Sequence, residues 1–261
     1  MRRFVPCLVL ALALKAGRLD AATATLVPSA DTSLFEENGD ASNAKGPGLF
    51  AGRNSLTFTR RALLKFDLTA IPAGSTVTGA RLELDLTRAK GNPVDVFLFR
   101  VTAPWGEGTS NSPDPGGTGA AATPGDATWT KRIWPGTDWT TPGGDTVGSP
   151  SARSPIATVL GTYAFGPTDE MVSDVQSWLD SPATNYGWQI AADELQAPPS
   201  ARRFGSRESV DPAEQPKLTV TFDPPGGSGR PANDVPALSF VALLGLAAAL
   251  AALGAGSLRK G

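Results

Sequence analysis

A stretch rich in side-chain oxygens near the N-terminus offers the clearest metal chemistry in this sequence. Asp31, Glu36, Asn38, Asp40 and Asn43 lie within a dozen positions of one another. Calcium accepts six to eight such hard oxygens in flexible geometry. The spacing does not fit an EF-hand loop, and oxygen-rich loops are often simply solvated. We expect either a structural calcium site or a solvated loop here.

Two tryptophans in a long irregular region could bind sugar. Trp134 and Trp139 are bracketed by polar and turn residues, and a flat indole face can stack on a pyranose ring. The alternative is that they pack the long loop onto the rest of the domain, as we also consider for Trp105. The remaining loop tryptophan, Trp129, has the same two interpretations.

A basic cluster surrounds Phe204. Arg202, Arg203 and Arg207 form the densest group of cations apart from Arg60 and Arg61. Arg202 and Arg203 are therefore candidates for binding an acidic polysaccharide. The alternative is a solvated sheet edge, where charge blocks unwanted strand pairing.

Composition excludes several classes of chemistry. The 261-residue chain has no His and a single Cys, Cys7. The chain therefore cannot use an imidazole base, a His metal ligand or a Cys/His zinc site. No stretch places two carboxylates in a recognisable acid/base arrangement, so we expect no enzyme activity and no catalytic residue.

The two ends of the sequence indicate export. Arg2 and Arg3 precede an apolar run over residues 4–14, and small residues at 22 and 24 fit signal-peptidase cleavage after Ala24. Residues 236–258 carry no charge and precede Arg259 and Lys260. About 20 apolar residues suffice to cross a bilayer, and the basic end predicts a cytoplasmic C-terminus.

The part between these ends is acidic. Without the four basic and one acidic residues of the leader and the two basic residues of the tail, 17 Lys and Arg stand against 24 Asp and Glu. A net charge of −7 argues against nucleic acid as a partner.

The segments that position these candidate residues have the sequence pattern of short β-strands. Residues 60–87 contain two segments in which Leu or Phe alternates with charged residues, the period of half-buried strands. Their dozen-residue connection suggests that the second strand crosses to another sheet. We expect further strands at residues 94–101, 156–165, 185–192 and 217–222. We also expect a helix at 168–179 with Thr168 as its N-cap. Trp178 in this helix and Trp188 in a strand are expected to lie in the core.

Several segments in order resemble the DNRLRE domain family, among them ADTSLF, SNAKGPGLFAG, RRALLKFDLTAIPAGSTVTGARLELDL, PWGEGTS, ATWTKR, MVSDVQSWLDSPATNYGWQI, FGSRE and PKLTVTF. The resemblance implies a secreted jelly-roll of two antiparallel sheets, similar to carbohydrate-binding modules. It also implies that Glu208 lies beside Asp31 as a distant metal ligand, although Arg207 could instead pair with that acid.

The tail, DVPALSFVALLGLAAALAALGAGSLRK, resembles sorting tags of the PEP-CTERM type. Such tags are read by an exosortase-like peptidase during delivery to the surface. Val235 to Ser239 depart from the Pro-Glu-Pro form, so a plain membrane anchor is the alternative.

We therefore predict an all-β jelly-roll β-sandwich with one short helix. Residues 1–24 are a signal peptide, 25–223 the sandwich, 224–235 a Gly/Pro-rich linker and 236–261 a membrane or sorting helix. The predicted function is a non-catalytic, exported cell-surface module that binds polysaccharide or extracellular matrix, with no cofactor beyond a structural calcium. The alternative is a purely structural or adhesive surface protein without a small ligand.

Overall fold

The alternating apolar residues of the sequence form the two strands from which the sandwich is built. The structure, a computed structural model, describes residues 21–226. Strand β5 (Thr59–Phe66) buries Leu64 and Phe66, and β6 (Thr76–Ala89) buries Leu82, Leu84 and Leu86. β5 pairs with β2 (Pro28–Phe35), β4 (Gly48–Arg53) and β13 (Trp188–Ala192). β6 pairs with β12 (Gly161–Phe165), β14 (Arg202–Gly205) and β15 (Lys217–Asp223). The expected crossing from one sheet to the other is confirmed.

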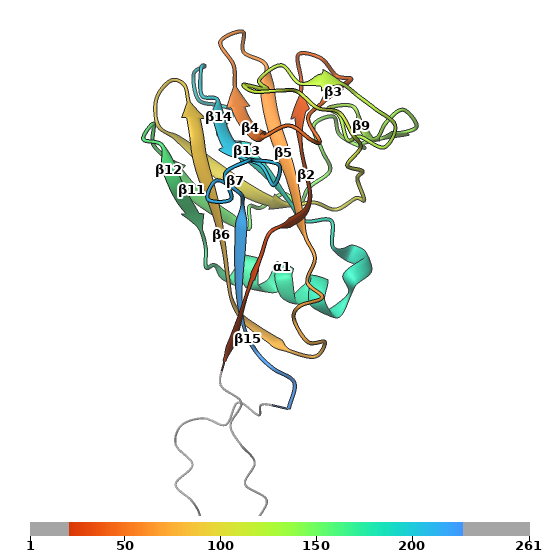
Figure 1. The fold of residues 1–261 in the computed structure, drawn as a ribbon, viewed down its shortest axis with the longest axis vertical. Helices are drawn as coiled ribbons and strands as arrows, with labels where there is room; N and C mark the ends of the chain where they lie inside the picture. Colours follow the sequence, from red (N-terminus) through yellow and green to blue (C-terminus); the bar gives the residue numbers. More distant parts are fainter. Residues whose placement is uncertain (1–20, 227–261) are drawn as a thin grey trace, which may run out of the picture. The chain divides into compact units, whose positions relative to one another are not determined.

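Two sets of antiparallel strands face each other across this core (Figure 1). β4 (Gly48–Arg53) pairs with a strand of each set, so the two are continuous along one side. The first set holds β1 (Ala22–Leu26), β15 (Lys217–Asp223), β6, β14 (Arg202–Gly205) and β12 (Gly161–Phe165). The second holds β2 (Pro28–Phe35), β5, β13 (Trp188–Ala192), β7 (Val94–Arg100) and β11 (Ala152–Ile156).

One helix closes the core between the sheets. Helix α1 (Asp169–Asp180) begins after Thr168, whose Oγ1 accepts the Met171 N–H at 3.1 Å, as predicted. A one-turn 3₁₀ helix, η1 (Pro182–Thr184), follows it. Trp178 is 1% exposed and its ring lies 4.6 Å from that of Trp188. Both are core residues, as expected.

The region after β7 is irregular but packed. It includes the short strands β8 (Ala120–Ala121), β9 (Lys131–Ile133) and β10 (Thr137–Asp138), and β8 pairs with β3 (Ala41–Ser42). Trp105 and Trp139 pack with Leu34 and Leu63 on the outer side of β2 and β5. Figure 1 shows this region beside β3, at the end of the sandwich away from α1.

One prediction about strands was wrong, and one strand was missed. The strand expected at 156–165 is two strands, because β11 pairs with β7 in one sheet and β12 pairs with β6 in the other. The chain turns between them and re-enters at Gly161, whose φ of +131° favours glycine. β14 was not predicted, since its Arg-Arg sequence lacks the usual alternation.

The predicted signal peptide overlaps the first strand of the described structure. Residues 22–24, which cleavage after Ala24 would remove, form the first half of β1 and pair with Val220, Thr221 and Phe222. No helix within residues 21–226 is long and apolar enough to cross a membrane. The predicted leader through residue 20 and the predicted sorting helix lie outside the described residues.

Candidate functional site

Three carboxylates from distant parts of the chain meet at one place. Asp31 lies on β2, Glu107 in the long loop after β7, and Glu208 directly after β14. One oxygen from each lies within 4.8 Å of the others. We call these three residues the carboxylate cluster.

Asp31 is the carboxylate of the cluster whose charged form is most disfavoured by burial. This residue is 0% exposed, and its Oδ2 accepts the Arg207 backbone N–H at 2.9 Å. Burial raises the pKa of Asp31 well above its ordinary value; the charge of Glu208 adds to this increase, and the Arg207 N–H opposes it. Burial also raises the pKa of Glu208, against the opposing charge of Arg207.

Two cations flank the cluster. Arg207 binds Glu107 through Nη2 at 2.5 Å and Glu208 through Nε at 3.1 Å. Lys45 lies 2.7 Å from Glu107 and 3.6 Å from Glu208. The Asp31 backbone N–H also donates to Glu107 at 2.8 Å. Glu107 therefore ties β2, the loop before β4 and the segment after β14 together.

The structure separates the metal ligands expected from the sequence. Asp31 and Glu208 come together as the resemblance implied, and the pairing with Arg207 occurs as well. Glu36, Asn38 and Asp40 are exposed on the turn after β2 and do not join Asp31. Glu36 instead accepts the Thr59 N–H at 2.6 Å.

Asn43 is also occupied elsewhere. It is 1% exposed, donates to the Gly48 carbonyl at 3.0 Å and accepts the Ser112 N–H at 2.9 Å. Sequence reasoning missed Glu107, which is 76 positions from Asp31. The available signal was its place two residues after Trp105, whose buried ring anchors the loop.

A basic cleft lies across β6, β14 and β4. Arg203 on β14 stands opposite Phe50 on β4 and opposite Arg88 on β6, so the three side chains share one face. Arg60 and Lys90 complete the cations at the rim of a cavity of about 190 Å³. Its other lining residues are uncharged, apart from the buried Arg202.

The cations of this cleft differ in how fully they are neutralised. Arg60 pairs with Glu37 at 2.5 Å, and Arg203 pairs with the exposed Asp114 at 2.9 Å. Within residues 21–226, Arg88 and Lys90 form no salt bridge and are exposed. The cleft therefore presents two free positive charges beside two partly neutralised ones.

Arg202 and Arg203 both line this cleft, but neither guanidinium is free. Arg203 donates from Nη1 to Thr87 Oγ1 at 2.6 Å and from Nη2 to the Pro47 carbonyl at 3.2 Å. Arg202 is 0% exposed and donates to the carbonyls of Lys90 and Ala201, at 2.8 and 3.1 Å. Arg203 is 8% exposed, and its chain lies over Gly48, where a Cβ would come within 2.4 Å of its Nε. Burial lowers the pKa of Arg203, and the charge of Asp114 opposes that effect.

The two candidate sugar-stacking tryptophans differ in exposure. Trp139 is 4% exposed, and its Nε1–H donates to the Thr128 carbonyl at 2.9 Å. Its indole faces are covered by packing, which corrects the prediction that it stacks on sugar. Trp134 is partly exposed at the end of β9 and stays a candidate.

A partly exposed aromatic pair was not singled out from the sequence. Phe97 and Phe99 on β7 point away from the core, with ring centroids 6.0 Å apart. They line a cavity of about 270 Å³ together with Arg61, Asp193 and Glu194. Arg61 is held by Glu194 through two hydrogen bonds, at 2.7 and 2.8 Å. Arg61, the cation that lines this cavity, is therefore already paired.

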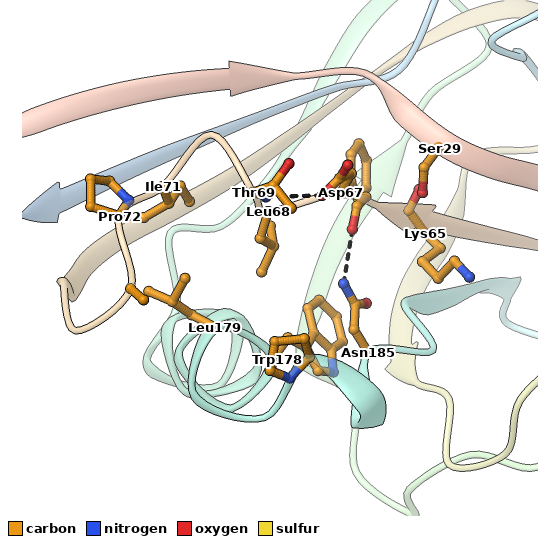
Figure 2. Close-up of a pocket in the computed structure, with 13 residues that line it drawn as sticks. Ser29, Lys65, Asp67, Leu68, Thr69, Ile71, Pro72, Trp178, Leu179 and Asn185 are labelled. Atoms are coloured by element: carbon orange, nitrogen blue, oxygen red, sulfur yellow. Dashed lines mark hydrogen bonds between the residues drawn. The ribbon is translucent and has the colours of Figure 1, made fainter.

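A larger groove lies between the β5–β6 connection and α1 (Figure 2). Its volume is about 560 Å³, and Leu68, Ile71 and Leu179 contribute apolar walls. Asn185 donates to the Phe66 carbonyl at 2.8 Å, and the Thr69 N–H lowers the pKa of Asp67. Asn185 Oδ1 accepts no hydrogen bond within residues 21–226. The aromatic side chains that line the groove are buried, and its walls are mainly apolar, so we do not place a sugar site there.

Comparison with known families agrees with the carbohydrate-binding interpretation. Residues 22–131 match the model of carbohydrate-binding module family 96. The chain therefore contains a domain like a carbohydrate-binding module. The match runs from β1 to the first residue of β9 and covers less than half of the chain. It includes Asp31, Glu107 and Arg88 but not Arg203 or Glu208. No curated protein matches the chain.

Proposed function

We propose that this chain is a non-catalytic carbohydrate-binding module and that an acidic polysaccharide binds at its basic cleft. The observation that carries this proposal is the pair of exposed cations Arg88 and Lys90, which form no salt bridge with any described residue and lie beside Arg203 on the adjacent strand β14. Guanidinium groups recognise carboxylate and sulfate groups through charge-assisted hydrogen bonds. The family match over residues 22–131 supports carbohydrate as the ligand class.

The charge distribution favours an anionic ligand over a neutral one. The segment between leader and tail has a net charge of −7 from 17 basic and 24 acidic residues, yet the residues that line this cleft include five cations and no Asp or Glu. Glu37 and Asp114 pair with two of these cations, Arg60 and Arg203, and leave Arg88 and Lys90 free of salt bridges within the described part of the chain. A cleft with one sign of charge raises the local concentration of oppositely charged ligand. The Phe97 surface instead has the acidic residues Asp193 and Glu194 at its rim, so it suits an anionic glycan poorly.

We also infer that the domain is a DNRLRE-type jelly roll that works outside the cytoplasm. The proposed leader would export it, and residues 236–258 would anchor it in the membrane or be removed by a sorting peptidase. Intact-mass spectrometry of the cell-surface form tests this directly. A form that retains both ends would contradict export by signal cleavage and sorting by tail removal.

The binding test compares purified wild type with an Arg88→Ser/Lys90→Ser variant. Calorimetry or affinity electrophoresis would measure binding to a polyuronate, a sulfated glycan and neutral glucans. We expect wild type to prefer the acidic chains, with affinity that falls as salt rises. Loss of two free charges should weaken binding about tenfold, which corresponds to about 1.4 kcal/mol.

Two control variants locate the effect. Arg81→Ser removes an exposed cation that is paired with Glu83 on the same strand, outside the cleft, and should leave binding unchanged. Phe97→Ala removes one ring of the partly exposed aromatic pair and should also leave acidic-glycan binding unchanged. Loss of binding with Phe97→Ala alone would move the site to that surface. Absence of binding to every glycan would favour the alternative, a purely structural or adhesive surface protein.

A further inference from the structure

The carboxylate cluster has the dimensions of one calcium coordination sphere. Two oxygens on opposite sides of a calcium ion, each at about 2.4 Å, are about 4.8 Å apart. One oxygen each from Asp31, Glu107 and Glu208 lies within that limit of the others. We propose that these three carboxylates bind a calcium ion that joins β2, the long loop and the segment before β15.

An independent observation at the same place supports a ligand. Asp31 Oδ1 and Glu208 Oε2 are buried and accept no hydrogen bond from any described residue. A buried polar atom without a partner costs free energy, and for a charged group the cost is larger. A cation between these two oxygens would remove that cost and the repulsion between the two carboxylates.

The neighbouring cations leave room for this ion. Arg207 and Lys45 both contact Glu208 through Oε1, so Oε2 is not engaged by either. With all three carboxyls ionised, the two cations leave the group with a net charge of −1. The Lys45 side chain is 33% exposed, and its flexible chain can turn towards water. Calcium would therefore compete with Lys45 for Glu107 and Glu208 and displace the lysine from them.

The ligand types indicate calcium rather than other common metals. All three donors are hard carboxylate oxygens, and zinc sites draw on His and Cys ligands that this domain lacks. Magnesium requires oxygens at 2.0–2.1 Å in near-octahedral geometry, so its opposite ligands lie only about 4.2 Å apart. Water can complete the coordination beside partly exposed Glu107 and Glu208.

The test uses the full chain, dialysed against chelator and titrated with calcium chloride in a calorimeter. We expect one calcium per chain with a Kd of about 10⁻⁴–10⁻³ M, the range of weaker protein calcium sites. The melting temperature should rise in calcium and return to its starting value in chelator, while magnesium should have a smaller effect. No glycan is present, so the outcome is independent of the proposed function.

Four variants distinguish calcium binding from a purely structural acid network. Glu208→Gln should weaken calcium binding at least tenfold while the chain still folds, because this side chain is partly exposed. Asp31→Asn should do the same if it folds. Lys45→Met should strengthen binding, because it removes the competing cation. Asp40→Asn changes an exposed acid outside the cluster and should leave binding unchanged.

The following results would overturn the proposal. Wild type with no heat of calcium binding, and with the same melting temperature in calcium and in chelator, would show that Arg207 and Lys45 hold the carboxylates without a metal ion. Equal calcium binding by wild type and Glu208→Gln would place the ion elsewhere in the chain.

Discussion

Replacing Trp139 by Ala should destabilise the domain strongly, because the structure assigns this tryptophan to packing. It is 4% exposed and lies in a cluster with Leu34, Leu63 and Trp105. Truncation of a buried Trp to Ala typically costs about 3–5 kcal/mol. The loss also leaves the Thr128 carbonyl without its indole donor.

Urea denaturation followed by circular dichroism measures this effect. With an m value of about 2 kcal/mol/M, a loss of 3–5 kcal/mol lowers the midpoint by about 1.5–2.5 M. The m value should be unchanged if only the native state is weakened. Trp134→Ala is the matched control, since Trp134 is partly exposed and should cost less than about 1 kcal/mol.

The reasoning would be refuted by a Trp139→Ala variant that keeps its midpoint but loses glycan binding. That pattern would mean that the indole face is available to a ligand in solution and that the loop opens without cost to the sandwich. A large loss of stability in both variants would instead show that Trp134 also packs the loop.

Two further predictions concern the scaffold. Asp174→Ala should lower the free energy of unfolding by about 3–5 kcal/mol, because it leaves the buried Trp188 N–H and Ser151 O–H without their acceptor. Asp169→Ala, on the exposed first turn of α1, should lower it by less than about 1 kcal/mol. Urea titrations of both variants measure the difference. A fragment of residues 25–235 should be less stable than one of residues 22–235 by about 2 kcal/mol. The reason is that Ala22 packs against the core and residues 22–24 pair with β15. Equal urea midpoints for the two fragments would contradict a structural role for this half of β1.

Local patterns in the sequence were sufficient for much of the scaffold. Leu82, Leu84 and Leu86 alternate with charged residues, and this period is produced by the strand itself wherever the strand packs. Thr168 caps α1 because capping needs only the next three residues of the chain. These are interactions between near neighbours, so one sequence is enough to read them.

Residue type alone misplaced other side chains. Arg202 lies in a dense basic cluster, and Trp139 has polar and turn residues around it; both patterns favoured an exposed, ligand-binding role. In the structure, Arg202 satisfies carbonyl oxygens at the ends of strands, and Trp139 covers the outer side of β2 and β5. Whether an arginine or tryptophan is buried depends on which distant strands lie beside it, and no local period records that.

The sequence by itself determined the strand periodicity, the capped helix, the absence of imidazole chemistry and the acidic balance of the domain. Only the tertiary structure brought Glu107 to Asp31 and Glu208, and set Arg88 beside Arg203 and Phe50. Both candidate sites are assembled from segments far apart in the chain. Their geometry follows from strand order and register, which are set by packing of the whole core rather than by any single segment.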